Sequence, residues 1–150
     1  TGGTEQMAKA AYEAAQPEAE TLLLRAETAS PEDLLSADGY IFAGPENLAA
    51  LSGAMIEFFD RAYYPVLGKL EGRPYAHLIC AGSDGENAAR QLARIATGWR
   101  LKAVQQTLIV NTQAQTEAEI LAAKTISEPD LDKCREIGAA LAAGISLGVF

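Results

Sequence analysis

The sequence predicts a doubly wound α/β domain, in which a parallel sheet is covered by helices on both faces. Its candidate strands are continuous apolar runs rather than alternating ones, which is typical of parallel strands buried on both sides. Segments with helical periodicity separate these runs, so that helix and strand alternate along the chain. With 150 residues, 49% of them apolar, we expect one domain with its own core.

The first third of the chain contains two helices and two strands. Residues 5–12 are helix-like, and Thr21–Arg25 is a short apolar run that suits a buried strand. Ser30 and Pro31 suit the N-cap and first position of a second helix, with Asp33 two residues further on. Gly39–Pro45 is the second strand, and we expect it to stop at the Gly-Pro pair.

From Leu48 onward the apolar spacing changes to three and four, which predicts a helix ending near Pro65. Its buried stripe would be Leu48, Leu51, Met55, Phe58, Phe59 and Ala62.

The remaining elements continue the alternation. Tyr75–Ala81 is the third strand, and Ser83 with Glu86 fits a capping box for the helix after it. Residues 104–110 form the fourth strand, and Ser127 caps a last helix. The inner faces of these two helices would be Ala89, Leu92, Ile95 and Ala96, then Leu131, Cys134, Ile137, Leu141 and Ile145.

We expect a further strand before Thr1, because the glycine turn at residues 1–4 is of a kind that normally follows a strand. Five strands and five helices match the order 2-1-3-4-5, in which this first strand is the middle one. A sheet without it would leave two ladders of backbone groups unpaired. The given sequence would then be an N-terminally truncated single domain.

Composition excludes several function classes. Acidic residues outnumber basic ones by 20 to 12, a net charge of −8, which argues against tracking along a nucleic acid backbone. No apolar run has the roughly 20 residues of a membrane span. No signal peptide is visible from Thr1 onward, although a truncated start would hide one. Cys80 and Cys134 lack metal-site spacing, so we interpret them as buried thiols of a protein in a reducing compartment, the cytoplasm.

Residues 1–4, Thr-Gly-Gly-Thr, have the composition of an anion-binding turn. The glycines let backbone N–H groups converge, the hydroxyls add donors, and the following helix contributes its unpaired amides and positive dipole end. A phosphate is the anion that suits such a turn. The alternative is an ordinary glycine turn that begins a helix.

Two more loops leave strand ends at the same edge of the predicted sheet: Pro45–Ala50 and Gly82–Glu86. Each is rich in small or polar residues, so a ligand can approach the backbone closely. The three loops together predict one cleft for a planar, phosphorylated ligand. The structural alternatives are a plain connection for the first loop and helix capping for the second.

Two motifs carry a resemblance to a known family. Thr1-Gly2-Gly3-Thr4 resembles the end of the flavodoxin phosphate loop, and residues 45–48 with 52–61 resemble the NAD(P)H-dependent flavin or quinone reductases of flavodoxin-like fold, including the tryptophan-repressor-binding-protein group. The resemblance implies a three-layer sandwich with one non-covalent FMN. Its phosphate would lie on the first turn and its ring between the other two loops. The implied cofactor-binding residues are Thr1, Gly2, Gly3, Thr4, Pro45, Glu46, Asn47, Leu48, Ala49, Ala50, Gly82, Ser83, Asp84 and Gly85.

The same resemblance implies electron transfer from NAD(P)H to a quinone or similar small-molecule acceptor, with the flavin rather than a side chain carrying the chemistry. It also leaves room for a homo-oligomer, a dimer or a tetramer. Neither ring loop contains an aromatic residue, unlike the loops of many electron-carrier flavodoxins, and Trp99 is expected far from them. His77 and the pair Tyr63 and Tyr64 are interpreted as structural.

Two other functions remain open. A flavodoxin-type electron carrier would use the acidic surface to dock basic redox partners. A flavin-free binding module could share the fold. A receiver domain is disfavoured, because the strand that ends at Pro45 has no acceptor aspartate.

Overall fold

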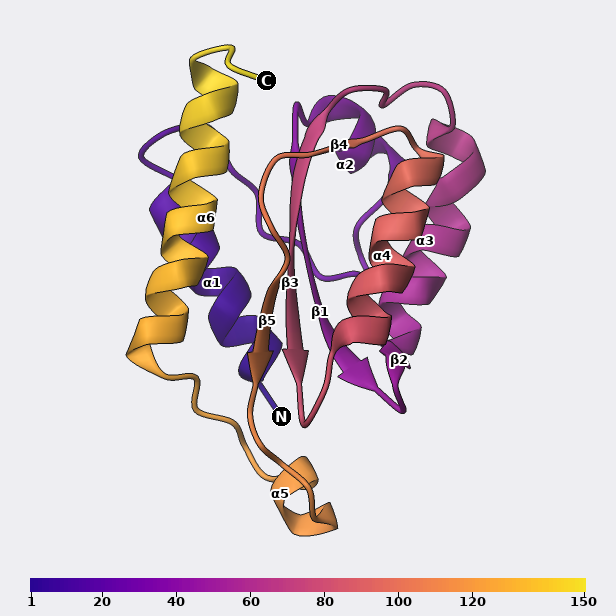
Figure 1. Ribbon diagram of the computed structural model, residues 1–150. Coiled ribbons are helices and arrows are strands. Elements are labelled where there is room, and N and C mark those ends of the chain that lie inside the picture. Colours follow the sequence, from indigo (N-terminus) through magenta and orange to yellow (C-terminus); the bar gives the residue numbers. More distant parts are fainter.

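A mixed sheet lies between two layers of helices in the computed structural model, which describes all of residues 1–150 (Figure 1). Its main strands are β1 (Tyr40–Asn47), β3 (Pro74–Ala81) and β5 (Leu108–Asn111). Two short strands, β2 (Ala50–Leu51) and β4 (Lys102–Ala103), extend the sheet beside β1 and β3. The α/β sandwich predicted from the alternation of helix and strand is therefore confirmed.

The registers identify β3 as the centre of this sheet. It pairs in parallel with β1 from Tyr75↔Tyr40 to Cys80↔Pro45, and with β5 from Leu78↔Leu108 to Ala81↔Asn111. All eight residues of β3 are buried, as expected of a continuous apolar run. The second, third and fourth strands predicted from the sequence are thus neighbours in that order.

The helices divide between the two faces. α1 (Gly3–Ala15) and α6 (Glu128–Ser146) pack together on one face. α2 (Pro31–Ser36), α3 (Gly53–Val66) and α4 (Glu86–Gly98) cover the other, and the short α5 (Glu117–Leu121) projects beyond the strand ends (Figure 1). Two predicted N-caps are confirmed: Ser30 forms a reciprocal capping box with Asp33, and the Ser127 hydroxyl accepts the N–H of Asp130.

Each face has its own core, because side chains of β1 and β3 alternate between the faces. Tyr40, Phe42, Tyr75 and Ile79 join the α3–α4 side, where 17 buried residues include all six buried aromatic rings. Leu78 and Cys80 join the α1–α6 side, whose core has eight buried residues and no aromatic ring: Met7, Ala10, Ala11, Leu78, Cys80, Val110, Ile126 and Cys134.

The predicted strand at Thr21–Arg25 is wrong. The segment has no strand partner, and the side chains of Leu22, Leu23 and Leu24 are between 43% and 68% exposed. A strand is stable only beside another strand, and β1 pairs with β3 along one edge and with β2 only at its last two residues. Most of the second edge of β1 is therefore open.

The predicted end of the second strand and start of the next helix are also wrong. β1 continues through Pro45 to Asn47, and α3 begins only at Gly53. Pro45 has no backbone N–H, but it is tolerated because its backbone faces the short β2 side, where few ladder bonds are needed. Its carbonyl accepts the N–H of Ser52 on that side. Leu48 is completely exposed, whereas the rest of the predicted stripe is buried: Leu51, Met55, Phe58, Phe59 and Ala62.

The fourth predicted strand is interrupted, since residues 104–107 separate β4 from β5. Val104 still donates its N–H to Tyr75, and Thr107 bonds the ring of the buried His77. His77 also stacks on Tyr75, with ring centroids 5.8 Å apart, and its interpretation as structural agrees with this packing.

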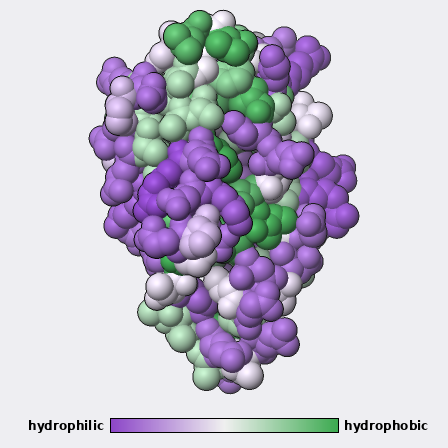
Figure 2. All heavy atoms as spheres, turned by 60° about the vertical axis from the view of Figure 1, so that its left-hand side comes forward, coloured by the Kyte–Doolittle hydropathy of each residue, from purple (hydrophilic) through white to green (hydrophobic).

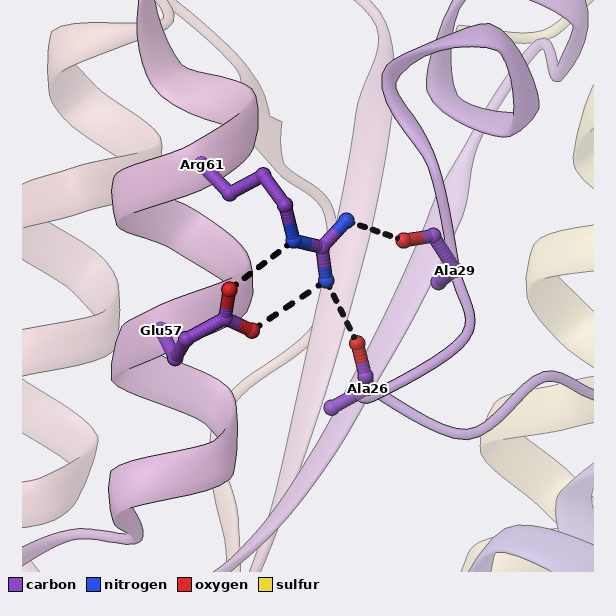
Figure 3. A network of polar contacts seen from close by, with 4 residues as sticks. All are labelled: Ala26, Ala29, Glu57 and Arg61. Carbon is purple, nitrogen blue, oxygen red and sulfur yellow. Dashed lines mark hydrogen bonds and ion pairs between the residues drawn. The ribbon is translucent and has the colours of Figure 1, made fainter.

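An arginine joins α3 to the irregular segment before α2 (Figure 3). The Arg61 guanidinium donates to the carbonyls of Ala29 and Ala26 at 2.6 and 3.1 Å, and it pairs with Glu57 one turn earlier at 2.9 Å. The hydrogen bond from Arg61 lowers the pKa of Glu57. This network fixes residues 26–29 to the helix although they have no regular structure of their own.

The face formed by α1 and α6 is mostly hydrophilic (Figure 2). Hydrophobic side chains gather at the upper end of this view and again near its middle. Leu147, Val149 and Phe150, which follow α6, are exposed. No helix in the structure combines the length and the apolar character needed to cross a bilayer.

Candidate functional site

The three loops predicted to form the ligand cleft lie at one end of the molecule. In Figure 1 the arrowheads of β1, β3 and β5 point to this end, and the N-terminus lies beside them. The first turn contacts β3 directly, because a Cβ added at Gly3 would lie 2.7 Å from the Sγ of Cys80. The other two loops are joined by hydrogen bonds described below. The three loops therefore lie at the same edge of the sheet, as predicted.

The turn at residues 1–4 leaves the first amides of α1 without a side-chain acceptor. Gly2 is the N-cap with a φ of +83°, a conformation that L-residues seldom adopt, and no side chain caps the helix. Thr1 and Gly2 are exposed. By contrast, hydroxyls cap α2, α5 and α6. An uncapped, 13-residue helix with a glycine turn suits an anion such as a phosphate.

Residues far along the chain hold this turn in place, and the sequence offered no signal for them. Lys124 donates its backbone N–H to the carbonyl of Thr1 at 2.8 Å. The Gln6 side chain donates to the carbonyl of Lys124 at 2.7 Å and accepts the N–H of Ile126 at 3.0 Å. These partners lie about 120 positions from Gln6 in sequence. The segment before α6 is thus the outer support of the turn.

Cys80 lies immediately behind the turn. Burial raises the pKa of its thiol, while a hydrogen bond with Thr4 and the charge of Lys124 act in the opposite direction. Burial likewise raises the pKa of Cys134 to about 11. Both cysteines are free and buried, so their interpretation as unpaired buried thiols is confirmed.

The second predicted loop, Pro45–Ala50, is a β-hairpin rather than the start of a helix. Leu48 and Ala49 are its two central residues, with φ of +52° and +57°. Positive φ at both positions is the pattern of a type I′ turn, which glycine and asparagine normally supply. The exposed Leu48 side chain is the one large apolar group on this loop. The hairpin therefore holds two non-glycine residues in a strained conformation next to the candidate site.

The third predicted loop, Gly82–Gly85, is shaped by close packing. A Cβ added at Gly85 would lie 2.6 Å from Ile109, and one added at Gly82 would lie 3.0 Å from the carbonyl oxygen of Ala114. Ser83 and Asp84 are exposed between them. The capping box predicted for Ser83 and Glu86 is wrong, because the N-cap of α4 is Gly85, which has no side chain. Asp84 rather than Ser83 is the loop residue whose side chain reaches the helix, and its Oδ1 accepts the N–H of Glu86 at 3.4 Å.

Glu46 occupies the start of α4 instead. Its Oε1 accepts the N–H of Gly85 at 2.9 Å, and its Oε2 accepts the N–H of Ala88 at 3.4 Å. Two side chains of α4 reach back to the hairpin: Asn87 donates to the carbonyl of Ala49, and Gln91 accepts the N–H of Leu51 at 2.7 Å. The second and third loops are thus one bonded unit, and Asn87 and Gln91 are contributors that the sequence did not reveal.

Two surface hollows, of about 240 and 170 Å³, lie away from the three loops and include none of their residues. The larger is lined by Leu67, Gly68, Glu71, Gly98, Trp99 and Arg100, where α3 and α4 end. Trp99 is buried there, stacked on Tyr63, so its expected position away from the loops is confirmed. A ring bound between the loops would meet no aromatic side chain from them.

Comparison with known proteins identifies relatives of one kind. A sequence profile described as NADPH-dependent FMN reductase matches residues 26–115. A flavodoxin of Aquifex aeolicus is 28% identical over 99% of this chain and 84% of its own length.

Solved structures share the fold at lower identity. A flavodoxin from the domain Archaea has a TM-score of 0.77 at 15% identity, covering 97% of this chain and 92% of its own. A flavodoxin, WrbA-like protein from Agrobacterium tumefaciens has a TM-score of 0.74 at 20% identity, covering 98% and 91%. The fold is therefore flavodoxin-like, as predicted.

Proposed function

The chain belongs to the NADPH-dependent FMN reductase family of FMN-binding flavoproteins, and we propose that it is an oxidoreductase that transfers electrons from NADH or NADPH to a quinone or similar small acceptor. The observation that carries the proposal is the position of three loops at the carboxyl edge of the sheet, with the amides of α1 uncapped beside them. Bound FMN would supply the hydride and electron transfer chemistry.

The protein's own groups would bind and orient the cofactor. The amides and hydroxyls of Thr1, Gly2, Gly3 and Thr4 would hold the phosphate, because no side chain caps the start of α1. Backbone groups of Pro45–Ala50 and Gly82–Gly85 would flank the ring and bond its nitrogens. With no aromatic side chain on either loop, one side of the ring would stay open to a second substrate. We assign no catalytic side chain.

The test uses the purified full-length protein. Titration of FMN, followed by quenching of its fluorescence, should saturate at one site per chain. The loaded protein should then oxidise NADH or NADPH in steady state when a quinone is present. Binding without turnover, tried with several quinone and dye acceptors, would contradict the reductase assignment. Failure to take up FMN would favour a flavin-free binding module.

A flavodoxin-type electron carrier is the second candidate. It is supported by the similarity to the Aquifex aeolicus flavodoxin along almost the whole chain, and by the net charge of −8, which suits docking to basic redox proteins. Electron transfer from the reduced, FMN-loaded protein to an oxidised partner protein, at a rate that falls steeply with added salt and without turnover of NAD(P)H, would identify this function.

We also propose that a strand preceding Thr1 in the polypeptide completes the sheet between β1 and Leu22–Leu24. The open edge of β1 and the exposed leucines support this arrangement. A cytoplasmic location, which the two unpaired cysteines support, and assembly into a dimer or tetramer belong to the same proposal.

A further inference from the structure

The hairpin of residues 45–52 is held in place by α4 rather than by its own turn chemistry. Its central residues, Leu48 and Ala49, have φ of +52° and +57°, and neither is a glycine or asparagine. Such residues keep this conformation only where surrounding contacts impose it. The conformation of Leu48 and Ala49 must therefore be imposed by contacts from outside the turn.

The contacts that impose it run in both directions between hairpin and helix. Glu46 reaches from the hairpin to the N–H groups of Gly85 and Ala88. Asn87 and Gln91 lie four positions apart on α4, so they project from one face, and they bond Ala49 and Leu51 of the hairpin. Glu46, before the turn, and Ala49, within it, are thus both tied to α4.

Glu46 differs from the other two side chains because it joins both ring loops at once. It belongs to the second predicted loop, and the amide it binds at 2.9 Å belongs to Gly85 of the third. Gly85 has a φ of +99° and cannot cap α4 through a side chain. The carboxylate therefore supplies the negative group that the helix N-terminus favours. It also fills the anion position of α4, which leaves the α1 turn as the uncapped glycine turn at this edge.

We propose that Glu46 is a positioning residue for the flavin ring, an inference that rests on the proposed FMN site. By bonding the hairpin to the Gly82–Gly85 loop, its carboxylate sets the two ring walls relative to each other before the cofactor arrives. The walls then need not be ordered when FMN binds, so less binding free energy is lost to ordering.

The experiment compares Glu46→Ala and Glu46→Gln with a matched control, Glu86→Gln. Glu86 carries the same charge at the same helix end, is exposed, and its side chain forms no hydrogen bond or ion pair with the hairpin. FMN affinity is measured by fluorescence quenching, and the flavin midpoint potential by titration, both well below the melting temperature of each variant. The hydrogen bonds by which Glu46, Asn87 and Gln91 join the hairpin to α4 are called the clamp below. Amide exchange at Gly85 in the FMN-free protein reports on the clamp directly.

We expect Glu46→Ala to weaken FMN binding about tenfold or more, to shift the midpoint potential and to speed exchange at Gly85. Glu46→Gln, which keeps one acceptor oxygen, should lose less, and Glu86→Gln should stay within about twofold of the natural protein. If Glu46→Ala does not fold, Asn87→Ala combined with Gln91→Ala tests the same clamp and should weaken FMN binding in the same direction.

The outcomes separate the two proposals. Unchanged FMN affinity and potential in Glu46→Ala, beside faster exchange at Gly85, would overturn the positioning role and leave Glu46 a helix cap only. An equal loss in Glu86→Gln would overturn it too, because the effect would then follow charge rather than contact. A natural protein that does not bind FMN would overturn the proposed function, and the positioning role with it.

Discussion

Gly138 of α6 lies directly against the backbone carbonyl of Ala11 in α1, so close that a Cβ at position 138 would overlap the carbonyl oxygen. The atom it would meet is backbone, which cannot rotate away as the end of a side chain can. The two helices of this layer are therefore spaced by the absence of a side chain. Gly138 thus serves the packing of α6 on α1.

Replacing Gly138 by alanine should therefore destabilise the fold by about 1–3 kcal/mol, because the helices must separate. Urea denaturation measures the change. Gly53→Ala is the control. Gly53 is the first residue of α3, and a Cβ added there would meet nothing within 4 Å, so the effect on stability should lie between neutral and slightly stabilising. Equal stability of the two variants would contradict the packing described here.

Replacing Ala49 by glycine should stabilise the protein by about 1 kcal/mol, since glycine adopts the positive φ of the hairpin without strain. The same change at Ala54, in the first turn of α3, should destabilise, because glycine there lowers helix propensity. Thermal or urea denaturation compares them. A loss of stability at both positions would mean that the hairpin conformation in solution differs.

Arg61→Lys should lower the melting temperature, because lysine cannot donate to Ala26, Ala29 and Glu57 together. Lys9→Gln, which removes only the exposed pair with Glu5, should change it little. Scanning calorimetry distinguishes them. Equal effects would show that residues 26–29 are held by other contacts.

Stability should fall as pH falls through about 6.5, owing to His77. Burial lowers the pKa of this ring in the folded protein, so the unfolded chain binds the proton more readily. The stability it contributes is complete above the unfolded-state pKa and is lost as pH falls toward the folded-state value. Between about pH 7.5 and about pH 5.5, the urea midpoint should fall less steeply in His77→Gln than in the natural protein. An identical decrease in both would show that His77 is not the cause.

Leu23→Ser tests the proposed strand beside β1. In the complete polypeptide, a strand covering this leucine would make the change cost about 2 kcal/mol, whereas the chain of residues 1–150 alone should tolerate it. Leu121→Ser, on the exposed face of α5, should be tolerated in both. If Leu23→Ser leaves the free energy of unfolding of the complete polypeptide unchanged, the proposed strand is contradicted.

Local signals predicted most elements correctly. The caps at Ser30 and Ser127 and the apolar run of β3 depend on neighbours within a few positions, and all three are confirmed. The errors arose where distant partners decide. Thr21–Arg25 has strand composition but no strand to pair with, and Leu48 has helical spacing but lies in a turn that α4 constrains.

The candidate site divides in the same way. Its three loops could be predicted because parallel strands end at one edge, and the glycine turn at residues 1–4 precedes α1 as expected. The supports could not be predicted. Glu46 reaches an amide 39 positions away, and Gln6 binds residues about 120 positions away, so no local pattern contains either contact.

The unequal division of aromatic rings has a practical consequence for spectroscopy. Trp99, the one tryptophan, lies in the layer with Phe42, Phe59 and Tyr63, so its emission will report the loosening of that layer alone. The layer built on Met7 and Cys134 has no aromatic ring in its core, so it can loosen without a change in the Trp99 emission. Since α1 begins at the glycine turn, a nucleotide bound there would reduce the motion of this layer. Backbone amide exchange would detect that change, whereas the Trp99 emission would not.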